Sequence, residues 1–191
     1  MNDLHSVMLV EDDPDFVFLI RQAIGQCQRL RFAGAAQSGE EGVALAQELR
    51  PRVVLMDLTL PGSMDGIDAA RAIRLATHAK VLLLTSCEDS ETIIRASKQS
   101  FASGYIFKSQ CQTLADTICR TAEALTPQAA MIQELTLSQL SPAERSIAEM
   151  LLAGDVAASS AKKTIANQKT SIFRKLGLRS TAELVHIFRH W

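Results

Sequence analysis

The sequence has few aromatic residues and no paired cysteines, and each shortage excludes a class of protein. Aromatic side chains make up 5% of the 191 residues, so we expect cores built mainly from aliphatic side chains. The four cysteines form no CxxC pair and have no matching histidine spacing, which argues against a zinc site or a disulfide framework. We interpret each cysteine as a small buried apolar residue in a reducing compartment.

Long apolar runs are also missing. No run approaches the roughly 20 residues needed to cross a bilayer, and the first residues lack the basic start and apolar stretch of a signal peptide. We therefore expect a cytoplasmic protein that does not enter a membrane. Residues 1–125 carry 12 Lys and Arg against 16 Asp and Glu, whereas residues 126–191 carry 8 against 5. Only the tail has the charge to meet a polyanion, and its excess is modest.

The first two-thirds of the chain alternates short apolar runs with helical patterns. We predict strands at 6–11, 30–36, 52–57, 80–85 and 104–108, and helices at 14–27, 39–49, 66–77, 89–99 and 112–125. Repeated strand–helix units imply parallel strands with right-handed crossovers and helices on both faces of the sheet. The predicted fold is therefore α/β, with a doubly wound sheet of five parallel strands.

Polar side chains stand at the ends of four of these strands: Glu11 and Asp12, Asp57, Thr85, and Lys108. Ligands bind at the carboxyl ends of the strands in an open parallel sheet, so these groups should converge on one crevice. Carboxylates with waters and a phosphate are the usual ligands of Mg²⁺, and a carboxylate can also attack phosphorus. The set favours a magnesium site at Glu11 and Asp12 with Asp57 as nucleophile, while Lys108 and Thr85 contact phosphoryl oxygens.

Each of these residues also has an ordinary structural explanation. An acidic pair after a strand usually lies near a helix N-cap, and a lone aspartate at a strand end is more often a turn former. Thr85 alone would be a strand terminus, and Lys108 alone a solvated loop lysine. It is the order of all of them, with a strand before each, that favours a functional site.

Three segments, 7–13, 57–62 and 104–108, resemble a two-component receiver domain, and the likeness extends over roughly residues 5–125. The resemblance implies a flavodoxin-like fold and a cognate sensor histidine kinase as partner. By this resemblance Asp57 is the phosphoacceptor and Lys108 contacts the phosphoryl group. The Mg²⁺ ligands would be Glu11, Asp12, Asp57 and the backbone of Thr59. Thr85 and Tyr105 would form a switch pair, although Tyr105 also fits an edge-strand aromatic.

The receiver-like part departs from the family pattern at two places. Ser63-Met64 adds one residue to the loop after Pro61-Gly62, and Ser100-Phe101 stands where many receivers have a glycine. Both departures leave the acidic residues untouched.

The tail, residues 140–191, follows a polar stretch at 126–139 that we interpret as a linker. Ser141, Pro142 and Glu144 are in capping-box order, which predicts a helix over 142–153 that ends at Gly154. A second helix should reach Leu176, and a last one should start near Thr181 and run to the end.

Residues 164–168 and 172–179 resemble the recognition helix of LuxR-type (NarL/FixJ) helix-turn-helix domains. The resemblance implies a small all-α domain, and a response regulator that binds promoter DNA as a homodimer when phosphorylated. The recognition helix would enter the major groove. Six of its residues would lie near bases or phosphates: Lys163, Thr164, Asn167, Gln168, Thr170 and Ser171. Three more would contact the DNA backbone: Lys169, Arg174 and Lys175.

The middle of the tail is atypical. Only residues 155–163 separate Gly154 from Thr164, which is roughly six residues fewer than a supporting helix and turn usually take. No Gly or Pro lies between Asp155 and Leu176, and the apolar residues fall near one helical face. We predict one long helix from about 156 to 176. The alternative is a stunted one-turn helix that keeps the usual four-helix outline.

Two other functions compete with a DNA-binding regulator. The short 155–163 segment also fits a phosphorylation-controlled protein whose tail acts through protein contacts, with weak or no DNA binding. A phosphatase that uses Asp57 as nucleophile would be expected to carry a general acid two residues on, where this chain has Thr59. We therefore expect no enzyme beyond self-phosphorylation from a donor and slow hydrolysis.

Overall fold

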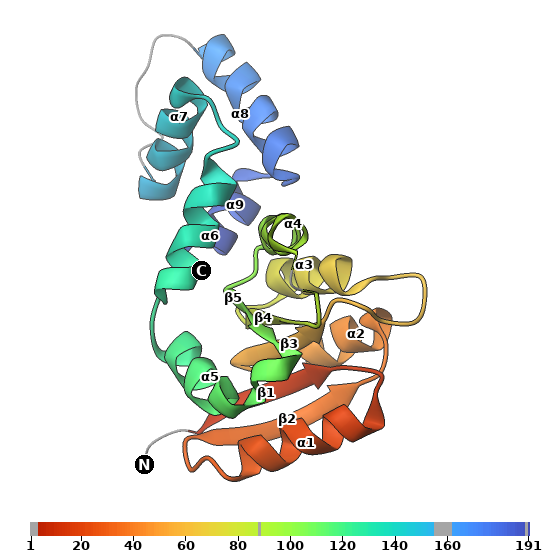
Figure 1. Cartoon of the computed structure of the whole chain (residues 1–191). Helices are drawn as coiled ribbons and strands as arrows, with labels where there is room; N and C mark the ends of the chain where they lie inside the picture. The colour runs from red at the N-terminus through yellow and green to blue at the C-terminus, as the bar shows by residue number, and fades with distance from the viewer. Residues whose placement is uncertain (1–3, 88, 155–161, 190) are drawn as a thin grey trace.

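A computed structural model describes residues 4–87, 89–154, 162–189 and 191 of the chain, with the backbone alone for 162–165. One parallel sheet forms the centre of its first part, with strand order β2-β1-β3-β4-β5 (Figure 1). The strands are β1 (His5–Val10), β2 (Leu30–Ala36), β3 (Val53–Asp57), β4 (Lys80–Thr85) and β5 (Gly104–Phe107). This order is that of flavodoxin-like folds, so the predicted fold class is confirmed.

Helices cover both faces of the sheet (Figure 1). Helices α1 (Pro14–Gly25) and α5 (Leu114–Glu123) pack on one face, and α2 (Gly39–Leu49), α3 (Gly66–Ala76) and α4 (Ser90–Ser100) pack on the other. Neighbouring residues of β3 point to opposite sides: Leu55 belongs to the first apolar cluster, and Val54 and Met56 belong to the second. Because both faces are buried, the strands have continuous apolar runs rather than alternating ones.

The ends of the elements lie within a few residues of the predicted ones. β1 ends at Val10 and β5 at Phe107, so Glu11 and Lys108 stand directly after their strands. A 3₁₀ turn over Lys108–Thr113 precedes α5, where we predicted a helix from residue 112. Shifts of this size are normal for element boundaries.

The stretch 126–139, predicted as a linker, contains helix α6 (Pro127–Leu137). The side chain of Thr126 accepts a hydrogen bond from the backbone N–H of Ala129 at 3.1 Å, and Pro127 occupies the first turn. The Thr-Pro pair that marks the end of the preceding helix therefore also starts the next one. Ile132 is buried on this helix, so the connection between the two parts of the chain is itself packed.

Three more helices follow: α7 (Pro142–Ala153), α8 (Lys162–Leu176) and α9 (Thr181–Arg189). The predicted capping box at Ser141 and Glu144 is present, and Gly154 ends α7 in the left-handed conformation with φ of 81°. The predicted long helix agrees with the structure over 162–176, while residues 155–161 lie outside the described residues. Within the described part of the chain, none of the helices is long and apolar enough to span a membrane.

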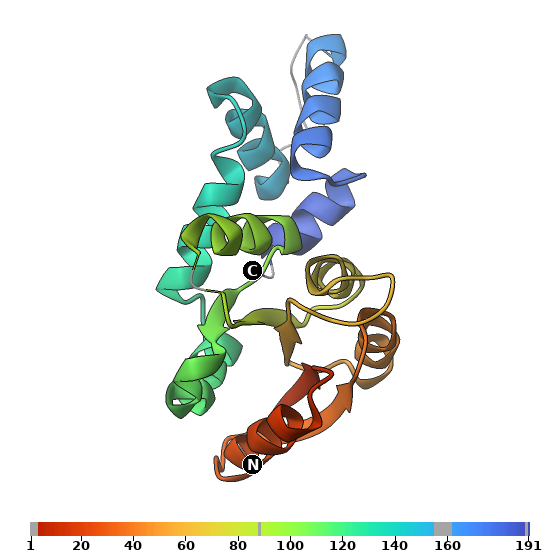
Figure 2. The same cartoon turned by 45° about the vertical axis from the view of Figure 1, so that its right-hand side comes forward.

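The tail helices lie on the α3–α4 side of the sheet (Figures 1 and 2). A third apolar cluster joins Phe101, in the connection between α4 and β5, to side chains from α6, α7, α8 and α9. The buried guanidinium of Arg74 in α3 reaches across to α9, where it donates to the carbonyl of Ile187 at 3.3 Å. The tail therefore packs against the α/β part through both apolar and polar contacts.

Candidate phosphorylation and metal site

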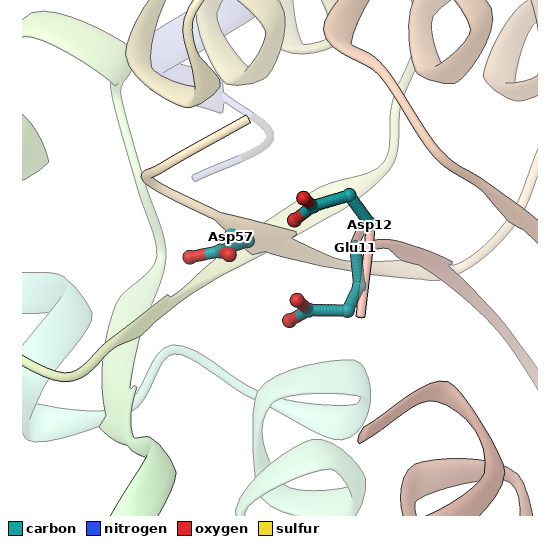
Figure 3. A group of neighbouring side chains, drawn as sticks. All are labelled: Glu11, Asp12 and Asp57. Atoms are coloured by element: carbon teal, nitrogen blue, oxygen red, sulfur yellow. The ribbon is translucent and has the colours of Figure 1, made fainter. Parts of the chain in front are cut away.

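Three carboxylates meet at the carboxyl ends of β1 and β3. One oxygen from each of Glu11, Asp12 and Asp57 lies within 4.8 Å of the others. Figure 3 shows Glu11 and Asp12 turned toward the side on which Asp57 lies. Glu11 is 1% exposed and Asp57 is 5% exposed, whereas Asp12 is open to solvent. The predicted convergence of these strand ends is therefore present.

Lys108 bridges two of the carboxylates. Its Nζ lies 2.7 Å from Glu11 Oε2 and 2.9 Å from Asp57 Oδ2. The ammonium also sits over the ring of Phe16, 4.8 Å from the ring centre, which adds a cation–π contact. A lysine held by two acids and an aromatic ring has little freedom, so its charge is fixed beside Asp57.

The charges of this site alter its proton affinities. Burial raises the pKa of Glu11 above its usual range, and the neighbouring Asp57 charge adds to the rise, while Lys108 partly offsets it. For Lys108 burial opposes the charged form, but the hydrogen bonds to Glu11 and Asp57 and the negative charges of both acids together outweigh it and raise the pKa. Lys108 therefore keeps its positive charge at neutral pH.

The site has the chemistry of a divalent metal site. Three carboxylates against one ammonium leave a net charge of −2 when all are ionised, which a divalent ion would neutralise. The Lys108 ammonium contacts one oxygen each of Glu11 and Asp57, and Asp12 is open to solvent and outside this pair of contacts, so the three acids together still offer oxygens to a cation. Oxygen ligands of this kind suit hard cations such as Mg²⁺.

The backbone around Asp57 holds its carboxylate in place. The Thr59 N–H donates to Asp57 Oδ1 at 3.2 Å, which places this residue beside the site as expected. Gly66, the first residue of α3, is close enough that a Cβ there would lie 1.9 Å from the Asp57 carbonyl oxygen. Neither Gly66 nor Phe16 was predicted, because both contacts depend on tertiary packing rather than on a local sequence signal.

The proposed switch residues lie on neighbouring strands, Thr85 at the end of β4 and Tyr105 near the start of β5. Thr85 is buried at the end of β4, where its hydroxyl accepts from the Cys87 N–H at 3.0 Å. The Tyr105 ring is half-buried and meets the Phe107 ring edge-on at 5.6 Å between centres. The Tyr105 N–H donates to the side-chain oxygen of Gln128 in α6, also at 3.0 Å. The backbone of the predicted switch residue thus contacts α6, the helix that connects the two parts of the chain.

The extra residue in the β3–α3 loop is anchored to α2. One carboxylate oxygen of Glu40, Oε1, accepts from the Ser63 hydroxyl at 2.6 Å and from the N–H groups of Ser63 and Met64, each at 3.1 Å. The hydroxyl bond is the main cause of a lowered pKa at Glu40, so this carboxylate stays ionised. The loop beside the acidic site is therefore tied down.

The predicted DNA-contacting residues share helix α8, but two of them are bonded to Glu144 of α7. Ser171 donates to Glu144 Oε1 at 2.7 Å, and Lys175 donates to Glu144 Oε2 at 2.6 Å. Exposed positions on the same helix are Asn167, Thr170 and Arg174. Gln168 and Lys169 are half-buried, and Lys163 and Thr164 lie where the backbone alone is described.

Comparisons with known proteins identify the family to which the chain belongs. The family model described as the response regulator receiver domain matches residues 7–118. The chain is 31% identical over 201 residues to the response regulator GacA of Pseudomonas aeruginosa, with 93% of this chain and 92% of GacA covered. It is also 27% identical over 165 residues to the nitrate/nitrite response regulator protein NarL of Escherichia coli, which covers 78% of this chain and 76% of NarL.

A similar arrangement occurs in a solved structure of RcsB from Salmonella enterica serovar Typhimurium bound to promoter rprA. The TM-score is 0.58 at 21% identity, and the match covers 98% of this chain and 99% of RcsB. At this identity the likeness concerns the fold alone. The fold, the acidic site and the family match together place the chain in the response regulator receiver family.

Proposed function

We propose that residues 1–125 form a receiver that is phosphorylated on Asp57, and that residues 140–191 form its output domain. The observation that carries this proposal is Lys108 Nζ, 2.9 Å from Asp57 Oδ2, beside carboxylates that suit a divalent ion. An Asp57 oxygen attacks the phosphorus of a donor, such as the phosphohistidine of a cognate sensor kinase. The P–N bond of the donor breaks, the imidazole leaves, and an acyl phosphate forms on Asp57. Lys108 then holds a positive charge against the transferred phosphoryl oxygens.

The metal proposed for this site is Mg²⁺, with Glu11, Asp12, Asp57 and the backbone of Thr59 as ligands. When bound, it supplies charge neutralisation for the phosphoryl group. Thr85 and Tyr105 are the proposed switch residues. The backbone N–H of Tyr105 donates to Gln128 in α6. A movement of β5 would therefore act on α6, which packs against the tail.

Phosphorylation is tested with the full chain, Mg²⁺ and a small acyl-phosphate donor. The wild type and Asp116→Asn should take up a single phosphoryl group that hydroxylamine removes, measured by intact-protein mass spectrometry. Asp57→Asn should take up none. Asp116 is a suitable control because it is an exposed carboxylate on α5 that pairs with Arg120 and is not among the acids of the site. Equal labelling of Asp57→Asn would refute the assignment.

For the output we propose sequence-specific binding of promoter DNA as a homodimer when Asp57 is phosphorylated. The proposal rests on the similarity to NarL and GacA over most of the chain and on the fold likeness to promoter-bound RcsB. It is supported by helix α8, whose last turn carries Arg174 and Lys175. Basic side chains there would contact phosphates, whereas exposed Asn167 would contact a base edge.

DNA binding is tested by gel shift and sizing of the beryllofluoride-activated chain at two salt concentrations. Lys169→Ala should weaken binding to all sequences and lower the slope of log affinity against log salt by about 1. Asn167→Ala should instead relax sequence selectivity, by about 1–3 kcal/mol at one base position. Arg31→Ala, an exposed change on β2, serves as control. Activated dimers that retain no DNA would favour the alternative, a tail that acts through protein contacts.

A further inference from the structure

A basic pocket lies between the α/β part and the tail. Its volume is about 290 Å³, and it is lined by residues of α3, α4, α6 and α8 and by the turn after each of α6 and α8. Five of its lining residues are cationic: Arg71, Arg95, Lys98, Arg174 and Lys175. Among the described residues, no carboxylate lines it. The pocket therefore concentrates positive charge from both parts of the chain in one hollow.

Three of these five cations have no carboxylate within ion-pairing distance among the described residues. Lys175 is paired with Glu144 at 2.6 Å. In contrast, Arg95, Lys98 and Arg174 form no ion pair with any described residue, and Asp89 acts on Arg95 only through a longer-range charge interaction. Their mutual repulsion is an unfavourable term that an anion in the pocket would remove.

One wall of the pocket is held in place by hydrogen bonds. Arg71 of α3 donates to the Gln99 carbonyl at 2.8 Å, to the Leu176 carbonyl at 3.3 Å, and to the Gly177 carbonyl. It therefore caps the carboxyl end of α8, where a cation is favourable. Gly177 has φ of 65°, and a Cβ there would lie 2.7 Å from Arg71 Nη2, so its missing side chain permits the contact. Arg71 thus locks the two halves of the pocket together.

We propose that this pocket binds a compact polyphosphate anion, such as inorganic tripolyphosphate or the phosphate tail of a nucleoside triphosphate. Arginine and lysine are the side chains that recognise phosphate oxygens, and three unpaired cations match a chain of linked phosphates better than a single one. Gln99, Thr136 and Gln139 add uncharged polar groups to the lining. No aromatic ring lines the pocket among the described residues, so recognition rests on the phosphates and not on a stacked base.

A bound anion would have a consequence for the output domain. It would contact α4 through Arg95 and Lys98 and α8 through Arg174, and so would strengthen the contact between the two parts. Arg174 and Lys175 are also proposed DNA-contacting residues. Polyphosphate and DNA should therefore compete for the protein, which couples the output to the supply of phosphate anions independently of Asp57.

The test is calorimetric titration of the full, unphosphorylated chain in about 0.15 M salt without divalent ions, where long-range surface charge is screened. The probes are inorganic phosphate, tripolyphosphate and ATP. We expect one-to-one binding of tripolyphosphate, weakened about tenfold in Arg95→Gln by the loss of a charge-assisted contact and further when Lys98→Gln is added. Arg31→Gln, an exposed change of the same charge on β2, should leave the affinity unchanged. If ATP binds as tightly as tripolyphosphate, the phosphate tail of a nucleotide is sufficient for binding in the pocket.

Three results would overturn the proposal. The first is that neither tripolyphosphate nor ATP binds saturably. The second is that Arg31→Gln weakens tripolyphosphate binding as much as Arg95→Gln does. The third is that Arg95→Gln changes DNA binding and leaves tripolyphosphate binding unchanged. The last would assign the pocket to the DNA interface. Because Arg95 is exposed, the variants should keep the wild-type melting temperature, which is measured in parallel. Asp57 labelling is unaffected by any of these results, so this proposal and the phosphorylation proposal fail separately.

Discussion

Gly66 shows how closely the backbone packs around the proposed phosphoacceptor. Its N–H approaches the Leu58 carbonyl at 3.4 Å as α3 begins, and the backbone of Asp57 runs directly against it. Any Cβ at this position would overlap the Asp57 carbonyl, so either the helix start or the end of β3 would have to move. The position of the Asp57 carboxylate depends on that strand end.

We predict that Gly66→Ala destabilises the fold by about 1–3 kcal/mol through overpacking and slows phosphorylation of Asp57. Gly25→Ala is the matched control, because a Cβ at Gly25 in α1 meets nothing within 4 Å. The control should be neutral or slightly stabilising, since alanine favours the helix. Urea unfolding and the labelling assay measure the two effects. If the two variants have the same stability and the same rate of labelling, the close approach of Gly66 to Asp57 does not matter for phosphorylation.

At the scale of secondary-structure elements, the side chain of Glu144 connects the start of α7 to helix α8. As part of the capping box it accepts from the Ser141 N–H at 2.7 Å, and it also receives Ser171 and Lys175 of α8. The hydrogen bond from Lys175 is the largest cause that lowers the pKa of Glu144, from the usual 4.5 to about 2. The side chain therefore caps α7 and holds α8 against it at once.

The lowered pKa of Glu144 predicts an acid-sensitive tail. A carboxyl whose folded pKa is depressed stabilises the fold fully above its unfolded pKa, and this contribution is lost as the pH falls from about 4.5 to about 2. Glu144→Gln should lower the melting temperature at neutral pH, and the gap to wild type should shrink as the pH falls through that window. Glu149→Gln, an exposed change on the same helix, should show a much smaller gap. A gap that does not change with pH would refute the ionic role.

The elements differ in how far the sequence could predict them. The strand ends were predictable because parallel strands of continuous apolar residues must finish on one edge, which brings Asp57, Glu11 and Lys108 together. The capping box at Ser141 was equally local. Helix α6 was missed because its apolar residues do not form one stripe: Met131 is exposed and Ile132 beside it is buried. Thr126 and Pro127 nevertheless carry a local start signal for this helix, an N-cap side chain followed by a first-turn proline.

At the scale of the whole molecule, Phe101 joins the two parts of the chain. It follows α4 with φ of 56°, a left-handed conformation that costs a non-glycine residue roughly 1–2 kcal/mol. Its buried ring meets Trp191 at 5.9 Å and Phe188 at 6.5 Å between ring centres, both edge-on, and Arg71 lies over it at 4.7 Å. The sequence revealed only that an aromatic residue replaces a common glycine. The reason for the replacement lies in the tail, which no local pattern could supply.

The single tryptophan makes this contact measurable. Trp191 is 6% exposed and packs against Phe101, so its emission reports whether the tail stays seated. We predict that Phe101→Ala shifts the emission to longer wavelength and lowers the unfolding free energy by about 3–5 kcal/mol, the usual cost of emptying a buried phenylalanine site. Phe18→Ala, on α1 with 65% of its side chain exposed, should change neither quantity appreciably.

Phe101→Gly separates packing from backbone strain. Glycine removes the same ring but adopts the left-handed conformation at no steric cost, whereas alanine retains the strain. The emission of Phe101→Gly should therefore shift as far as that of Phe101→Ala, because the ring is absent from both. Its unfolding free energy should be equal to or higher than that of Phe101→Ala, in contrast to the usual penalty for glycine. An unshifted emission in both variants would mean that the tail is held by Arg71 and Arg74 rather than by the ring. A much less stable glycine variant would mean that the left-handed backbone stores no strain.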